Sequence, residues 1–138
     1  MTTSRLPGEA VQNVSLFIRA WGEFVELRTQ PQDKWLGQAL LALQALPRFE
    51  IAVASDSTIV GGMILGMNPW DAHVGPCCAV WTQYVLPEFR NIGISRYLMR
   101  EAMRVAHSLD APVLSYSHRV ADWKYETIYR KVHANTQN

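Results

Sequence analysis

The stretch LPEFRNIGISRYLMREAMRVAH, residues 86–107, contains the feature that decides the fold. A proline ends an apolar run, an arginine follows three residues later, and a helical pattern opens on Gly93. A helix that only packs begins better on a capping side chain and a strong helix former. The glycine therefore indicates a turn that brings backbone amides close to a bound group.

This turn has the residue types of an anion site. The first N–H groups of a helix have no partner within the helix, and the helix dipole places partial positive charge there. Gly93 removes the side chain that would block an approaching phosphate, Ser95 adds a hydroxyl, and Arg90 and Arg96 add charge. The alternative is that Gly93 only relieves a tight strand-to-helix turn and that Arg90 is a solvated surface residue.

The elements around this turn predict one domain with a central sheet. Apolar periodicity predicts four helices, over 14–27, 33–46, 93–108 and 122–132, with Asp33 as the cap of the second and Asp122 as the cap of the last. Alternation and turn signals predict four strands, over 49–55, 58–67, 77–86 and 112–118. A loop is predicted over 68–76. The strand–helix–strand unit near the end predicts a right-handed parallel crossover, while the earlier hairpin makes the sheet mixed. The fold class is therefore α+β or α/β, with N-terminal helices in residues 1–47 and the sheet in residues 48–132.

Composition excludes several classes of function. The chain has 138 residues and a net charge of +1, so neither nucleic acid nor a membrane is an indicated partner. No run reaches transmembrane length, and no leader-type segment opens the chain. Cys77 and Cys78 are neighbours on a strand and point to opposite faces, which predicts reduced structural residues and no metal site. These features predict a cytoplasmic protein.

The segment YVLPEFRNIGISRYLMREAMRVAHSLDAPVL, residues 84–114, resembles the signature region of the GCN5-related N-acetyltransferase (GNAT) superfamily. In that superfamily a strand ends in a Pro-Glu-aromatic-Arg run, followed by Arg/Gln-x-x-Gly-x-Gly/Ala and a helix. The resemblance implies a GNAT-like fold, acetyl-CoA as cofactor and a compact form of the kind found in phages and bacteria. The cofactor-binding residues that it implies are Tyr84, Val85 and Leu86 for the pantetheine arm, and Arg90, Asn91, Ile92, Gly93, Ile94, Ser95 and Arg96 for the pyrophosphate. Ser95 departs from the pattern, because the family prefers Gly or Ala there.

The sequence indicates the catalytic residues less clearly than the cofactor-binding residues. The family often takes its proton donor from a tyrosine in the last helix, and Tyr129 in IYRKVHA matches that position. The alternative for Tyr129 is a packing residue of an amphipathic helix. The strand over 77–86 carries no carboxylate to serve as general base. Asp71 and His73 lie in the preceding loop, and His118 ends the following strand. Histidine suits the task, but the alternative for each histidine is an exposed residue.

The resemblance also implies two missing strands. The usual first strand is not evident before the N-terminal helices, and HANTQN, residues 133–138, is too short and polar for the final strand. An uncovered sheet edge favours pairing between chains, so a homo-oligomer or larger assembly is expected. The sequence therefore predicts an acetyl-CoA-dependent N-acetyltransferase for a small amine, an aminoacyl group or a protein lysine. The alternative is a catalytically silent GNAT-like scaffold, for example in a virion, with Trp70 and Trp123 as interface anchors.

Overall fold

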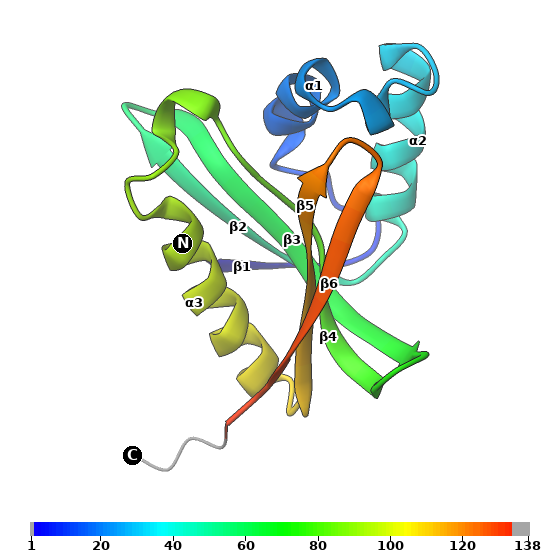
Figure 1. Ribbon diagram of the computed structural model, residues 1–138, viewed down its shortest axis with the longest axis vertical. Helices are drawn as coiled ribbons and strands as arrows, with labels where there is room; N and C mark the ends of the chain where they lie inside the picture. Colours follow the sequence, from blue (N-terminus) through cyan, green and yellow to red (C-terminus); the bar gives the residue numbers. More distant parts are fainter. Residues whose placement is uncertain (1, 134–138) are drawn as a thin grey trace.

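The computed structural model describes residues 2–133 and folds them into a sheet with helices on both faces (Figure 1). The elements are β1 Thr2–Arg5, α1 Val14–Glu23, η1 Val25–Leu27, α2 Gln32–Gln44, β2 Arg48–Ser55, β3 Thr58–Asp71, β4 Gly75–Val85, η2 Pro87–Phe89, α3 Ile94–Ser108, β5 Val113–Ala121 and β6 Lys124–Lys131. Among these residues no helix has the length and apolar character needed to cross a bilayer.

The sheet is mixed, as the sequence predicts. Its six strands lie in the order β1-β2-β3-β4-β5-β6, and every neighbouring pair is antiparallel except β4 and β5. Helix α3 makes the crossover between these two parallel strands. It begins at Ile94, and its N-cap is Gly93, whose φ is 97°. The expected helix over 93–108 and the parallel crossover are confirmed.

The helices divide the core into two layers. Helix α3 packs on one face of the sheet, where Leu98, Ala102 and Leu114 are fully buried. Helices α1 and α2 cover the other face, where Phe17 and Ile64 are buried against half-buried side chains of α2. Figure 1 shows α3 on one side of the strands and the α1–α2 pair on the other.

The N-terminal part differs from the prediction in three details. Thr2–Arg5 forms strand β1, antiparallel to β2, so the first strand is present. A stretch of four mostly polar residues carries no alternation of its own, and only pairing with β2 makes it a strand. The first helix ends at Glu23 and continues as the 3-10 turn η1, and the second begins at Gln32 with Pro31 as its cap, ahead of Asp33.

The expected loop over 68–76 is also wrong. Strands β3 and β4 extend into this segment and form a long hairpin that turns between Asp71 and Gly75. The turn signals Asn68 and Pro69 fall at an irregularity in the pairing, where the ladder skips from Asn68–Cys77 to Asp71–Gly75. A proline is tolerated at such a bulge because no ladder hydrogen bond is required of it.

The last element is a strand. Residues 124–131 form β6, antiparallel to β5, where the sequence predicted a helix over 122–132. Tyr125, Thr127, Ile128 and Tyr129 are β-branched or aromatic residues, which favour a strand once a neighbouring strand is available. Among the described residues β6 is the last strand of the sheet, and no helix follows α3. The expected absence of a further strand concerned residues 133–138. HANTQN lies outside the described residues from Ala134 onward.

Candidate active site

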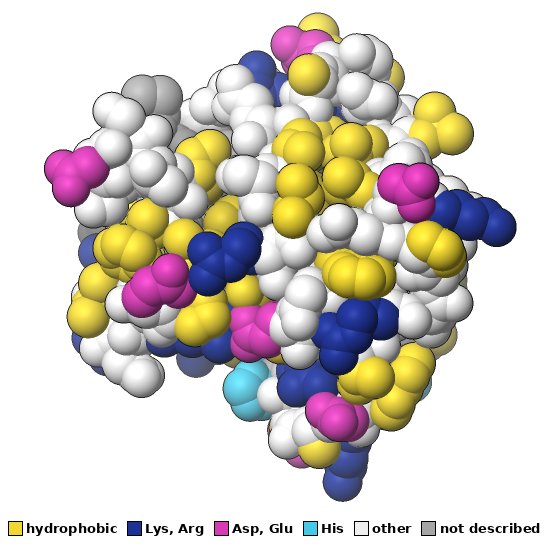
Figure 2. Space-filling model, turned by 90° about the horizontal axis from the view of Figure 1, so that it is seen from above, with side chains coloured by type: hydrophobic (Ala, Val, Ile, Leu, Met, Phe, Trp, Pro, Cys, Tyr) yellow, Lys and Arg dark blue, Asp and Glu magenta, His cyan; other side chains and the backbone are white. Residues whose placement is uncertain are grey.

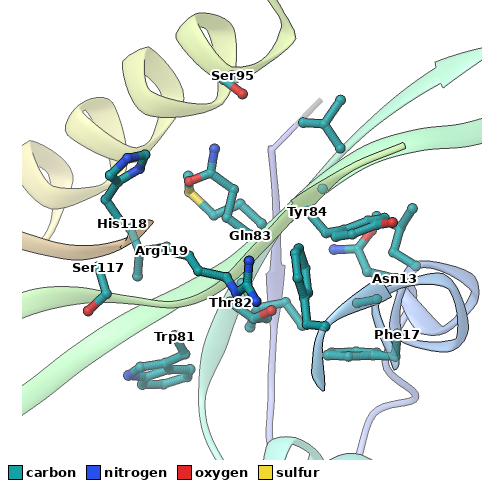
Figure 3. Close-up of a pocket in the computed structure, with 18 of the residues that line it drawn as sticks. Asn13, Phe17, Trp81, Thr82, Gln83, Tyr84, Ser95, Ser117, His118 and Arg119 are labelled. Carbon is teal, nitrogen blue, oxygen red and sulfur yellow. The ribbon is translucent and has the colours of Figure 1, made fainter. Parts of the chain in front are cut away.

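A cleft opens where β4 and β5 separate. The two parallel strands pair only at Cys78–Leu114 and Ala79–Ser115, and beyond this point they diverge. The cleft has a volume of about 470 Å³ and lies between the start of α3, helix α1 and the β5–β6 hairpin (Figure 3). Because a strand gap this close to a helix start exposes backbone donors and acceptors, the cleft suits an extended polar ligand.

A bulge in β4 shapes one wall of this cleft. Thr82 pairs with Ile64 and Val80 pairs with Leu65, so Trp81 is an extra residue in β4. The bulge places the side chains of Trp81 and Thr82 on the same face, the one that α1 and α2 cover. Gly66 makes room for the indole, because a Cβ at Gly66 would lie 2.5 Å from Cη2 of Trp81.

The backbone of β4 offers hydrogen-bonding groups to the cleft. The N–H of Leu86 donates to the carbonyl of Val60 on β3, at 2.8 Å. Because successive residues of an antiparallel strand face alternate sides, the main-chain groups of Gln83 and Val85 face away from β3 and into the gap. The carbonyl of Val85 accepts a hydrogen bond from Nε of Arg90, at 2.9 Å.

The turn before α3 has the geometry of an anion cradle. Asn91 and Gly93 both have positive φ, 66° and 97°, so consecutive amides turn toward one side. No heavy atom lies within 4 Å of a Cβ placed on Gly93, which leaves the approach to the first turn of α3 open. Ile92, Ser95 and Arg96 are exposed, and Ser95 also lines the cleft.

Arg90 is held by protein groups. Its guanidinium makes two hydrogen bonds of 2.8 Å with the carboxylate of Glu23 at the end of α1. The hydroxyl of Tyr84 donates to the same carboxylate, at 2.6 Å. The hydrogen bonds from Arg90 lower the pKa of Glu23, while burial and then Glu23 raise the pKa of Tyr84 to about 12. Arg90 therefore ties α1 to the cradle, and Arg96 is the more accessible cation.

The β5–β6 hairpin closes the other side of the cleft. Nε and Nη2 of Arg119 donate to the two oxygens of Glu26 in η1, at 2.9 and 3.1 Å. Glu26 also accepts from the main-chain N–H of Trp123 at the hairpin turn and from the hydroxyl of Tyr125. These contacts hold the hairpin against η1. They also favour the charged form of the Glu26 carboxylate, because that form accepts several hydrogen bonds.

The contact of Glu26 with the hairpin is expected to weaken in acid. The hydrogen bonds from Arg119 lower the pKa of Glu26 from 4.5 to about 2. A folded-state pKa below the unfolded value means that the stabilisation is complete above pH 4.5 and is lost as the pH falls toward 2. The melting temperature of the protein should therefore exceed that of Glu26→Gln by a constant amount above pH 5, and the difference should shrink toward pH 2. A difference independent of pH would contradict the assignment.

The two catalytic residues predicted from the sequence lie together outside the cleft lining. The hydroxyl of Tyr129 on β6 donates to Asp71, at 3.1 Å, and its ring meets that of His73 edge-on, with centroids 6.0 Å apart. Burial and then Asp71 raise the pKa of Tyr129. Tyr129 pairs with Ser115, so it lies beside the point where β4 and β5 part, while exposed His73 sits in the β3–β4 turn.

His118 lines the cleft directly. Leu114 on the same strand is buried in the α3 layer, so His118, four residues later, points to the α3 side of the sheet. Figure 3 shows His118 and Gln83 toward α3, with Trp81 and Ser117 on the opposite side.

The sequence analysis missed the wall formed by Ser117, Arg119 and Tyr125. These residues line the cleft because β5 and β6 form a hairpin, which the helix prediction for 122–132 excluded. The alternation of β-branched and aromatic residues over 124–131 is compatible with a strand, but the same segment also fits a helical spacing.

Comparisons with known proteins agree with this architecture. The profile of the acetyltransferase (GNAT) family matches residues 14–123. No curated protein sequence matches the chain. Similar solved structures include a ribosomal-protein-alanine N-acetyltransferase from Brucella melitensis biovar Abortus 2308, with 17% identity, a TM-score of 0.60, and coverage of 88% of this chain and 82% of that one.

Two further structures share the fold. A GCN5-related N-acetyltransferase from Ralstonia eutropha JMP134 has 18% identity and a TM-score of 0.58, with 86% of this chain and 84% of that one covered. Naa20 from Chaetomium thermophilum, solved with a bisubstrate analogue, has 16% identity and a TM-score of 0.58, with 89% and 64% covered. Since the family profile spans more than half of the chain, this protein belongs to the acetyltransferase (GNAT) family of acetyl-CoA-dependent N-acetyltransferases.

Proposed function

We propose that acetyl-CoA binds along the cleft, with its pyrophosphate on the turn before α3 and its pantetheine arm beside β4. The observation that carries this proposal is the open turn at Gly93 next to the diverging end of β4. The phosphate-binding groups would be the amides of Ile92, Gly93, Ile94, Ser95 and Arg96. The arm would lie beside Tyr84, Val85 and Leu86. Because the main-chain groups of Tyr84 and Leu86 face β3, its pairing partners would be those of Val85 and Gln83.

The acceptor side of the cleft is apolar and carries little charge. Its walls come from α1, η1 and the β4 bulge: Leu16, Phe17, Phe24, Leu27, Trp81 and Thr82. Among the described residues that line the cleft none is Asp or Glu. Figure 2 looks onto this end of the molecule and shows apolar patches bordered by adjacent basic and acidic side chains, without a broad area of one charge.

The nearest carboxylates are already paired. Glu23 accepts hydrogen bonds from Arg90 and Tyr84, and Glu26 accepts them from Arg119. A polycationic acceptor would need such groups as counter-ions, and freeing one would leave an arginine without its partner. We therefore propose a small acceptor with one weakly basic amine on an aromatic or branched apolar body.

The chemistry agrees with a weakly basic amine. The amine nitrogen attacks the thioester carbonyl, a C–N bond forms, the C–S bond breaks, and the thiolate of CoA takes up a proton. The attacking amine must be neutral, and on the acceptor side the described lining offers no carboxylate or histidine to deprotonate an ammonium. An amine that is already neutral near pH 7 avoids this requirement.

Two residues are candidates for protonating the thiolate. Tyr129 stays the prediction from the sequence, but its hydroxyl already donates to Asp71. His118 lies on the α3 side of the cleft, beside the proposed cofactor path, and an imidazole can act as a general acid. His73 stays a prediction as general base, although it lies at the β3–β4 turn.

Substitution of His118 is expected to have the larger effect on the rate. Because general acid catalysis contributes on the order of 10²-fold or more, His118→Asn should lower kcat by about 10²-fold and leave the Kd for acetyl-CoA nearly unchanged. Tyr129→Phe and His73→Asn should each lower kcat by less. Steady-state kinetics and calorimetric titration measure the two quantities, and a larger loss for Tyr129→Phe would restore the tyrosine as donor.

Titration of purified protein with acetyl-CoA and with desulfo-CoA tests the cofactor site. Saturable binding of both is expected, and no binding at millimolar cofactor would reject the proposed function. Turnover is then followed with an aromatic monoamine, an aliphatic monoamine of the same shape, and a polycationic aminoglycoside. Preference for the aromatic amine supports the acceptor proposal, and preference for the polycation rejects that proposal alone. Binding without turnover of any amine would favour a silent GNAT-like scaffold.

The cytoplasmic location stays a proposal. Cys77 and Cys78 are both buried and free of disulfide bonds, the state that a reducing compartment maintains.

A further inference from the structure

Strand β6 is an exposed edge of the sheet. Within residues 2–133 its only strand neighbour is β5, and six of its eight residues are exposed. Figure 1 shows β6 at the end of the sheet, on the far side of β5 from β4. Because an edge strand presents a row of N–H and C=O groups, it is a template for another strand.

The hydrogen-bond phase of β6 defines which residues face outward. The N–H of Val132 donates to the carbonyl of Pro112, at 3.0 Å, and the pairing of β6 with β5 is regular from Tyr125 to Lys131. In a regular antiparallel pair, residues that face the partner strand alternate with residues that face away. Val132, Arg130, Ile128 and Glu126 therefore bond to β5, and Lys131, Tyr129, Thr127 and Tyr125 turn their main-chain groups outward.

This phase restricts how two copies of β6 can pair. In an antiparallel pair related by a two-fold axis, outward residues must lie opposite outward residues, so the axis passes through a single residue of each copy. With the axis at Ile128, Glu126 of each copy lies opposite Arg130 of the other copy, so two such pairs form. With the axis at Thr127, Lys124 would lie opposite Arg130, which places like charges together.

The favourable register also places the charged pair where side chains are closest. Glu126 and Arg130 bond to β5, so across the two-fold they form non-hydrogen-bonded pairs, whose Cα atoms approach most closely. Both side chains are exposed in the single chain and lie on the same face as Ile128. Lys124 and Lys131, which would otherwise protect the edge, lie opposite uncharged Val132 and Tyr125 in this register.

We propose that two copies of this chain form a dimer by antiparallel pairing of their β6 strands, with the two-fold axis at Ile128 and Glu126–Arg130 pairs on both sides of it. The two six-stranded sheets then become continuous. The dimer uses the edge farthest from β1 and does not require the cofactor cleft to be occupied.

Sedimentation of the full chain across a concentration series, combined with charge reversal, tests the proposal. The unaltered protein should dimerise at micromolar concentration. Glu126→Arg and Arg130→Glu each create two like-charge pairs, and each should weaken dimerisation by about tenfold or more. The double variant, and an equimolar mixture of the two single variants, should restore it, because both recreate opposite-charge pairs.

The controls separate this register from other outcomes. Arg100→Glu reverses an exposed charge on α3, away from β6, and should leave dimerisation unchanged. Restoration in the equimolar mixture also shows that the single variants had not simply failed to fold. A monomer at 100 µM, or a dimer insensitive to both single reversals, would overturn the proposal, and so would recovery of a different protein bound at β6 from the expressing cells in place of a second copy.

Discussion

Replacing Arg48 by alanine is expected to lower the free energy of unfolding by about 3–5 kcal/mol, the cost of breaking a buried ion pair from one side. Nε of Arg48 lies 2.9 Å from Oε2 of Glu50, and the two side chains are 0% and 1% exposed. The substitution would leave the carboxylate of Glu50 buried without this partner. Urea denaturation followed by circular dichroism measures the loss.

Arg48 also joins segments that are far apart in the chain. Its guanidinium donates to the carbonyls of Leu43 at the end of α2 and of Glu9 and Ala10 before α1. Glu50 in turn accepts from the main-chain N–H groups of Gln12 and Asn13. Replacing both Arg48 and Glu50 by apolar residues would therefore leave these backbone groups unpaired. For this reason a hydrophobic contact cannot substitute for this ion pair, as it can for some other buried pairs.

An exposed ion pair provides the control. Arg19 lies 3.1 Å from Glu88, and its side chain is 47% exposed. Arg19→Ala is expected to cost less than about 1 kcal/mol, because solvent screens an exposed pair. Equal losses for the two variants would show that the buried pair does not hold the N-terminal segment in place.

Gly93→Val is expected to weaken acetyl-CoA binding by at least about 100-fold. A branched side chain at this position would occupy the open approach to the amides of the first turn of α3. Hydrogen bonds to a charged group contribute about 1.5–3 kcal/mol each, so the loss of two would exceed a factor of 100. Isothermal titration with acetyl-CoA measures the change.

Backbone strain has to be separated from the loss of phosphate contacts. A β-branched residue at φ +97° is strained wherever it stands, at a cost of about 1–3 kcal/mol. Gly8 has a φ of +89° and an equally open Cβ position, but it does not line the cleft. Gly8→Val should therefore lose comparable stability and bind acetyl-CoA normally. Normal binding by Gly93→Val as well would place the pyrophosphate elsewhere.

Local sequence predicted the turn and the helix of residues 87–108 well because its signals are short-range. Pro87 ends the strand, and Gly93 tolerates the positive φ that the turn requires. The apolar stripe of α3 predicts the helix. Each of these signals lies within a single turn or a single helix. The hairpin, the helix boundaries near 93–108 and the parallel crossover follow from the same kind of pattern. The contact of Arg90 with Glu23 was not foreseeable, because its partner lies 67 residues away on α1.

The β6 segment shows why the catalytic half was harder. Residues 124–131 satisfy a helical spacing of Tyr125, Ile128 and Val132 as well as a strand alternation, so periodicity could not decide between them. Pairing with the neighbouring strand β5 makes this segment a strand. Tyr129 therefore lies on a strand where a helix was predicted, and Arg119 lies in the wall of the cleft.

The sequence by itself therefore determined the family, the glycine turn before α3 and the elements whose hydrogen bonds are local. Only the tertiary structure decided where β4 and β5 part, which charges near the cleft are already paired, and that β1 and β6 are strands. The physical reason is that strand pairing and ion pairs join residues distant in the chain, as with Glu26 and Arg119, which are 93 residues apart. Their geometry exists only after the sheet has formed.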